Sequence, residues 1–275
     1  MELEKILLVL NSGAPSAAQV GVTMTLAQAH GAEVEGLYLA AEPVLPFDDD
    51  FAIGPAAVGA VLAERDHLVH KAMAESRALF ERAAHEKAVR TSWTAAAASA
   101  SRIPAALARA ADLVVIRNPG PADPDGRMFV AGVVLGAGTP CLIVPDEAKS
   151  DALFDRIVVA WNGSREAKRA VDDALPLLRS ASAVRVLSLG EPRNAEEPTA
   201  ADVRHHLARH GIAAEESHRE CRHGAGEALL ADCQEFQAQL LVMGAYGRSR
   251  FSEALLGGVT FTALTHARIP LLLSH

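Results

Sequence analysis

Short apolar runs alternate with helical stretches along the whole chain. In the second half, the runs predict strands at 156–161, 183–189, 213–219, 239–243 and 269–273, with helices between them. Apolar strands that alternate with helices are typical of βα units, whose parallel sheet is covered by helices on both faces. The first half follows the same pattern, with an irregular segment at 43–55 and a long helical stretch over 56–85.

The two halves of the chain repeat one structural unit. An apolar run that ends at Asn and small residues occurs at 5–13 and again at 156–164, and an alanine-rich helical stretch follows each. Two later strands also correspond, 111–116 with 239–243 and 139–144 with 268–273. We therefore predict an α/β fold with two tandem doubly wound parallel-sheet domains of five strands each. Their expected bounds are 1–147 and 154–275, with a polar linker starting at Asp146.

The two predicted domains are expected to pack on each other as a pseudo-symmetric pair. Edge strands expose unpaired N–H and C=O groups, and two related units in one chain can cover each other's edges. A homodimer of the whole chain is a further expectation.

A glycine-rich loop in the second half has the character of a phosphate cradle. Gly244-Ala245-Tyr246-Gly247-Arg248-Ser249-Arg250 follows an apolar strand, and Gly257-Gly258-Val259-Thr260 precedes a helix predicted over 261–266. At a junction of strand, loop and helix, glycines let backbone N–H groups approach an anion, and the helix N-terminus adds partial positive charge. The alternative is that Gly244 and Gly247 only permit a sharp turn and that Gly258 only packs against the sheet.

The order of these residues resembles the nucleotide-binding signature of the universal stress protein family. The match is Gly-x2-Gly, nine residues, Gly, a small residue and Val-Thr, and it ends in a closing strand at 269–273. The resemblance implies a tandem universal stress protein with the adenine nucleotide alpha hydrolase-like fold. It also points to the last strand of each half as the meeting element, which places strands 140–144 and 269–273 near the shared interface. It also implies ATP or a related adenine nucleotide as ligand, with Mg²⁺ as an optional companion ion, and a role in stress adaptation. The chain departs from the family at Gly258, where a Ser or Thr is usual, although Thr260 matches.

The resemblance also implies which residues bind the nucleotide. In the family an Asp at the end of the first strand contacts the nucleoside, and Asn162 stands at that position; its alternative role is a turn or a helix cap, shared with Ser164. The first half has Arg117-Asn118-Pro119-Gly120 in place of the first glycine pair, so we predict a degenerate first domain and one competent site. The candidate cofactor-binding residues are Ala160, Trp161, Asn162, Gly163, Leu187, Leu189, Gly244, Gly247, Arg248, Ser249, Gly257, Gly258, Val259 and Thr260.

Charge and composition bear on partners and compartment. The formal net charge is −8 and no Lys/Arg block occurs, which argues against nucleic acid and anionic membranes as partners. Cys141, Cys221 and Cys233 form no CxxC pair, which fits a reducing compartment. The N-terminus lacks the basic region of a signal peptide, and no apolar run approaches the ~20 residues that span a bilayer. We expect a cytoplasmic protein.

The sequence lacks recognisable catalytic motifs, which favours a regulatory protein over an enzyme. There is no Gly-x-Ser-x-Gly elbow and no P-loop, so no catalytic residue is assigned. His206 and His210 share a predicted helix face beside His205, and His218, Cys221 and His223 cluster in sequence; both groups, like the acidic run 48–50, are expected to be surface features without metal. Two alternatives stay open, namely a scaffold protein that binds no nucleotide and a slow ATP hydrolase.

Overall fold

The computed structural model describes residues 2–11, 15–41, 55–98, 105–149, 151, 153–190, 198–221, 224–245 and 258–275. Strands and helices alternate along both halves of the chain, as the apolar pattern predicts. The strands are β1 (Lys5–Asn11), β2 (Glu33–Ala41), β3 (Thr91–Ala98), β4 (Leu113–Arg117), β5 (Cys141–Val144), β6 (Arg156–Trp161), β7 (Ala183–Leu189), β8 (Ala214–Arg219), β9 (Leu240–Gly244) and β10 (Leu271–Ser274). The helices are α1 (Ala17–His30), α2 (Pro55–Lys87), α3 (Ala105–Arg109), α4 (Pro124–Ala137), α5 (Arg165–Ser180), α6 (Ala200–Arg209), α7 (Ala225–Glu235) and α8 (Gly258–His266).

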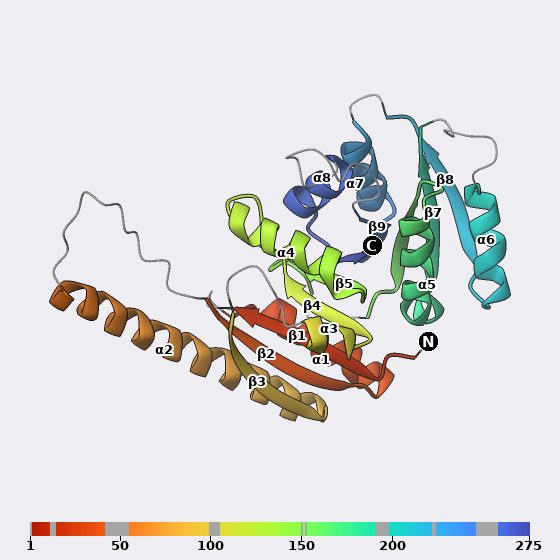
Figure 1. The fold of residues 1–275 in the computed structure, drawn as a ribbon. Coiled ribbons are helices and arrows are strands. Elements are labelled where there is room, and N and C mark those ends of the chain that lie inside the picture. The colour runs from red at the N-terminus through yellow and green to blue at the C-terminus, as the bar shows by residue number, and fades with distance from the viewer. Residues whose placement is uncertain are drawn as a thin grey trace.

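All ten strands form one continuous sheet in the order β3-β2-β1-β4-β5-β10-β9-β6-β7-β8 (Figure 1). Neighbouring strands are parallel within each half, and the halves meet where β5 and β10 pair antiparallel, with Leu272 opposite Leu142. This confirms the α/β fold class with five strands in each half, and it places the two predicted strands at the seam.

Helices cover both faces of the sheet, because alternate strand residues point to opposite sides. One apolar cluster joins the sheet to α1, α2, α5 and α6, through residues such as Phe80 and Leu207. The other joins it to α3, α4, α7 and α8, through residues such as Val130 and Leu229. Because the seam is antiparallel, the strands of the two halves run in opposite directions. The carboxyl ends of the strands therefore lie on one side of the sheet in the first half and on the opposite side in the second half. We call the row of carboxyl strand ends of each half its carboxyl edge, as distinct from the outermost strands β3 and β8.

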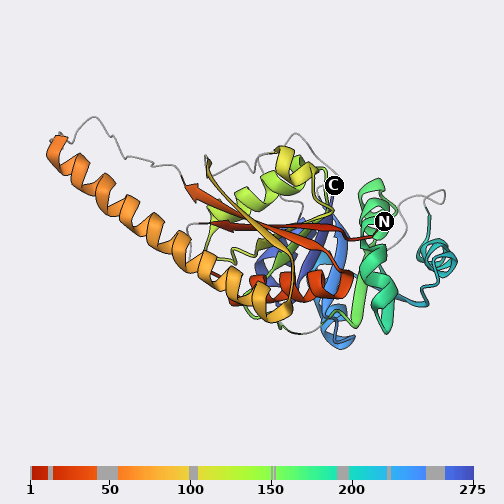
Figure 2. The same cartoon turned by 90° about the horizontal axis from the view of Figure 1, so that it is seen from below.

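The predicted elements agree with the structure to within a few residues, with one informative difference. The last helix, α8, begins at Gly258 rather than at Phe261, so Gly258, Val259 and Thr260 form its first turn. The predicted long helix is α2, which has 33 residues. Its first half extends beyond the sheet (Figure 2), where Val61 and Leu68 are exposed. No helix within the described ranges combines the length and apolarity needed to cross a bilayer.

Candidate functional site at the carboxyl edge of the second half

The candidate site lies where the winding of the second half reverses direction. β6 has β9 on one side and β7 on the other, so the chain winds away from β6 in both directions. Ligands of open α/β sheets bind beyond the carboxyl ends of strands at such a point. The register aligns these ends, since Trp161 lies opposite Ser188 and Ala160 lies opposite Met243. The predicted residues of the first, second and fourth strands of this half therefore share one edge.

The turn after β6 is built by short polar side chains. Asn162 Oδ1 accepts a hydrogen bond from the Ser164 backbone N–H at 3.1 Å, and Gly163 between them has a φ of 75°. Ser164 then caps α5, because its hydroxyl accepts from the Ala167 N–H at 3.1 Å. Trp161 is buried and donates its indole N–H to the Pro198 carbonyl at 2.7 Å. The turn role named as an alternative for Asn162 is therefore present in the structure.

The two described glycines of the predicted cradle have different surroundings. A Cβ added at Gly244 would lie 2.5 Å from both the Ala167 nitrogen and the Glu166 carbonyl carbon, so this glycine lets β9 pack closely against the start of α5. A Cβ added at Gly258 would meet no atom within 4 Å. Close packing thus accounts for Gly244, whereas the packing named as the alternative role of Gly258 is absent from its described surroundings.

The N-terminus of α8 lies at the same edge, because α8 follows β9 in the chain and leads back to β10. Gly258 is exposed, Val259 is half-buried and Thr260 is 4 % exposed. The first turn of α8 contains no acidic residue. Unpaired N–H groups and the helix dipole make such an end favourable for an anion. Four further candidate residues, Gly247, Arg248, Ser249 and Gly257, lie outside the described residues.

Leu187 and Leu189 also take the places expected of them on the second strand of this half. Leu187 is fully buried, and Leu189 at the end of β7 packs against the apolar cluster on the α7 and α8 side. Their side chains therefore pack in or against the core, and only their main-chain groups are left for a ligand at this edge.

A buried carboxylate lies beneath Gly244. Glu166 in the first turn of α5 is 5 % exposed and accepts a hydrogen bond from Arg165 at 2.6 Å. Burial would raise the pKa of Glu166, but the Arg165 hydrogen bond and the charges of Arg165 and His275 outweigh it and hold that pKa below its ordinary value. Glu166 therefore keeps its charge at neutral pH, where it complements the N-terminus of α5.

The corresponding crevice of the first half is filled by a side chain. Gln19 is 2 % exposed, and its amide nitrogen donates to the carbonyls of Val9 at 2.8 Å and Val115 at 3.3 Å, between β1 and β4. Gln19 and Ala167 are equivalent, because each donates its backbone N–H to the capping serine three residues before it. In the second half, the methyl group of Ala167 thus takes the place of the Gln19 side chain, which bridges β1 and β4 in the first half.

Carboxylates occupy the anion-binding positions of the first half. Asp123 caps α4, accepting from the Gly126 N–H at 2.8 Å, and Asp125 adds a second acid in the first turn. Arg117 at the end of β4 donates three hydrogen bonds to the Asp146 carboxylate, at 2.9, 3.2 and 2.5 Å. The hydrogen bond from Arg117 lowers the pKa of Asp146, so this carboxyl group stays ionised. The helix N-terminus and the arginine are both already neutralised within the chain.

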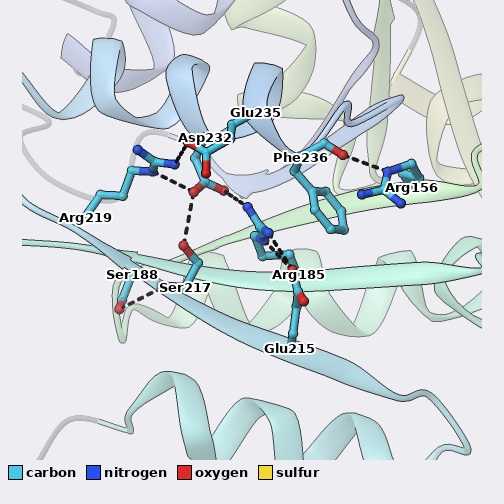
Figure 3. A network of polar contacts seen from close by, with 9 residues as sticks. All are labelled: Arg156, Arg185, Ser188, Glu215, Ser217, Arg219, Asp232, Glu235 and Phe236. Atoms are coloured by element: carbon cyan, nitrogen blue, oxygen red, sulfur yellow. Dashed lines mark hydrogen bonds and ion pairs between the residues drawn. The ribbon is translucent and has the colours of Figure 1, made fainter.

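Sequence patterns did not reveal a buried charge network beside the second-half sheet (Figure 3). Asp232 of α7 is fully buried and accepts hydrogen bonds from Arg219 at 2.7 Å, Ser217 at 3.0 Å and Arg185 at 3.4 Å. The Phe236 ring also lies 4.2 Å from the Arg185 guanidinium. Every partner of Asp232 comes from β7 or β8, so the network fixes α7 on these strands. The only sequence signal was an acid amid apolar helix residues.

The histidines form contacts without a metal centre. His206 lies 3.2 Å from the Asp172 carboxylate, and its ring centroid is 4.8 Å from that of His210. Within the described part of the chain, no group of three or more His, Cys, Asp or Glu side chains is placed to hold a metal ion. Cys141 and Cys233 are buried and Cys221 is half-buried, and all three are free thiols. Two other candidates, His223 and the acidic run 48–50, lie outside the described residues.

Comparison with known proteins identifies the second half. The model of the universal stress protein family matches residues 153–275, the region that contains the site described above. Residues 153–275 form a universal stress protein domain. A comparison with curated proteins finds no match for the chain.

Solved structures extend the likeness to the whole chain. A universal stress protein from Archaeoglobus fulgidus DSM 4304 is 15% identical, covers 98% of this chain and 95% of its own, and has a TM-score of 0.70. A putative universal stress protein from Pseudomonas aeruginosa UCBPP-PA14 is 15% identical, covers 99% of this chain and 93% of its own, and has a TM-score of 0.60. At this identity the likeness concerns the fold alone, and it extends over both halves of the chain.

Proposed function

We propose that the second half binds ATP or a related adenine nucleotide, with or without Mg²⁺, at the carboxyl edge between β6 and β9. The observation that carries the proposal is the N-terminus of α8, which has no acid in its first turn and has open space at Gly258. The phosphates would lie against this helix end, and the base would lie along the ends of β6 and β7. Membership of 153–275 in the universal stress protein family supports a role in stress adaptation.

The proposal assigns a single site to the chain. Gln19 closes the crevice of the first half, and Asp123 supplies the anion that its α4 N-terminus would otherwise attract. A phosphate approaching Arg117 would have to displace Asp146. These contacts support a degenerate first domain over 1–147, with a competent domain over 154–275.

The bound nucleotide is proposed to act as a regulatory ligand rather than as a substrate. The residues assigned to the site are mainly backbone donors and short polar side chains, and rapid phosphoryl transfer needs a positioned base or a metal-binding hydroxyl. A cytoplasmic location and a homodimer complete this proposal.

A scaffold that binds no nucleotide is the second candidate, and two observations favour it. Gly258 lacks the hydroxyl usual in the family, and the Asn162 side-chain oxygen is engaged in its own turn. A slow ATP hydrolase is the third candidate, and release of inorganic phosphate on incubation with Mg²⁺ and ATP distinguishes it.

Two measurements test the proposal. Mass spectrometry of small molecules released from the purified full chain should identify an adenine nucleotide. Isothermal calorimetry with ATP, cAMP and GTP should then compare the wild type with Gly258→Asp and its neutral counterpart Gly258→Asn. The added carboxylate should weaken ATP binding at least tenfold, because it repels phosphate and compensates the partial positive charge of the α8 N-terminus. Gly258→Asn should retain binding, since the position has open space.

The outcomes separate the candidates. Absence of ATP binding to the wild type at roughly millimolar concentration supports the scaffold. Equal binding by the Asp and Asn variants would show that the phosphates lie elsewhere than at α8.

A further inference from the structure

The two edges of the ten-stranded sheet differ in chemistry. β8 at one edge carries Glu215, Glu216, His218 and Arg219 within its six residues. β3 at the other edge has eight residues, Thr-Ser-Trp-Thr-Ala-Ala-Ala-Ala, with no charge and no proline. Charged side chains and prolines are the usual means of protecting an edge strand from pairing with another chain. The structure therefore protects the β8 edge and leaves the β3 edge without such protection.

The charges of β8 are also engaged in ion pairs that fix them on the edge. Glu215 pairs with Arg185, Glu216 with Arg204, and Arg219 with Asp232, at 2.6, 2.6 and 2.7 Å. A strand that docked on β8 would desolvate this row of charges, which is costly. Docking on β3 carries no such cost.

β3 is held in an extended, regular form that suits strand pairing. It pairs in parallel with β2 over its whole length, from Val34 opposite Thr91 to Ala41 opposite Ala98. Trp93 anchors the strand from one face, with its ring centroid 5.3 Å from that of Phe80 on α2. Gly36 makes this close packing possible, since a Cβ there would lie 2.8 Å from the Trp93 ring. No other strand of the described residues pairs with the outer edge of β3.

We propose that β3 is a dimerisation edge, which pairs antiparallel with β3 of a second copy of this chain across a two-fold axis. An antiparallel pair of identical strands is symmetric by construction, so the same groups meet on both sides of the axis. An uncharged strand of small residues meets its own copy without opposing like charges. The chain already joins its two similar halves in this way, through β5 and β10. The interface is independent of nucleotide binding.

A second copy fits this edge better than a bound peptide does. Peptides that add to a sheet edge gain specificity from pockets for alternate side chains. The described side chains of β3 are exposed at Thr91, Ser92, Thr94 and Ala95, and the partly buried Trp93 is packed inside. A two-fold axis perpendicular to the sheet also keeps both α2 helices on the same face.

The size of the edge makes α2 part of the proposed interface. Eight paired residues span about 26 Å. A stable dimer buries about 800 Å² per protomer, so a strip of that length must be about 30 Å wide. The strand alone is narrower, and the neighbouring flank of α2 supplies the remaining width.

Light scattering of the full chain at concentrations from about 1 to 200 µM tests the proposal. The wild type should pass from the mass of one chain to twice that mass, and Ala95→Lys should raise the dimer dissociation constant at least tenfold. The control is Ala208→Lys, which adds the same charge at an exposed position on α6, near the opposite edge. Circular dichroism of both variants verifies that they are folded. A monomer throughout the range, or a dimer that both lysine variants weaken equally, overturns the proposal.

Disulfide trapping locates the axis independently. Single cysteines at Thr91, Ser92, Thr94 and Ala95 are introduced with Cys221→Ser, since Cys141 and Cys233 are buried. In an antiparallel pair, only the residue nearest the axis faces its own copy, so one position should give a maximum of cross-linked dimer. Uniformly low cross-linking in a chain that light scattering shows to be dimeric would place the interface elsewhere and overturn the proposal.

Discussion

Gly258→Ser should tighten binding of ATP to the second half. Gly258 is the first residue of α8, it is exposed, and a Cβ at this position would meet no atom within 4 Å. Its φ lies outside the left-handed region, so an L residue is not strained there. A serine hydroxyl can therefore be added without moving any described neighbour.

The size of the effect follows from the kind of hydrogen bond formed. A hydrogen bond to a charged group contributes about 1.5–3 kcal/mol. Each 1.4 kcal/mol changes a dissociation constant about tenfold, so ATP should bind roughly 10- to 150-fold more tightly. The gain should fall on the phosphates, so adenosine should bind the variant and the wild type equally.

Isothermal calorimetry with ATP and adenosine measures this effect, and Gly258→Ala is the matched control. Alanine adds the same Cβ without a hydroxyl, and it favours a helix more strongly than serine does, so tighter ATP binding by the serine variant than by the alanine variant must come from the hydroxyl. Equal ATP affinity in these two variants, or weaker binding by the serine variant, would refute a phosphate position at the start of α8.

Three further predictions concern packing and assembly. Gly244→Ala should lower stability by about 1–3 kcal/mol in urea titration, because its Cβ would lie 2.5 Å from the α5 backbone. The matched control is Gly136→Ala, which should not lower stability, because a Cβ there would meet nothing within 4 Å. Burial raises the pKa of Asp173, so the folded chain holds this proton more tightly than the unfolded chain, and stability from this group declines as the pH rises past about 4. Asp173→Asn should therefore raise the denaturation midpoint at neutral pH and lose that gain in acid; an equal gain at both pH values would contradict it. Residues 151–275 alone should dimerise or aggregate through the freed edge of β10, and a stable monomer in light scattering would contradict this.

Most of the fold could be predicted from the sequence because burial on two faces makes each strand a continuous apolar run. Leu240-Leu241-Val242-Met243 is fully buried, and such a run has few alternatives between two helical patterns. The family resemblance then pointed to the last strand of each half as the meeting element, and the pairing of β5 with β10 confirms it. The start of α8 was placed three residues late, because glycine at 258 and β-branched residues at 259 and 260 favour a helix weakly.

Whether a side chain fills the crevice at the carboxyl strand ends of each half could not be predicted from the sequence, because the filling depends on contacts between distant residues. Gln19 is a polar residue near a helix start, and nothing in the sequence around it indicates that its side chain bridges β1 and β4. Its partner on β4, Val115, lies 96 residues further along the chain. Asp232 likewise finds its three partners on two strands of the folded sheet. Periodicity identifies which face of an element is buried, whereas it carries no information about which polar partners meet there.

Helix α5 connects the candidate site to the seam between the halves. Its first turn, at Glu166, lies against Gly244 at the carboxyl edge. One turn later, Arg169 donates a hydrogen bond to the Gly138 carbonyl of the first half at 2.6 Å, and it also lies 3.6 Å from Asp173. A shift of α5 that accompanied nucleotide binding would thus reach the first half through Arg169, although the two carboxyl edges lie on opposite sides of the sheet.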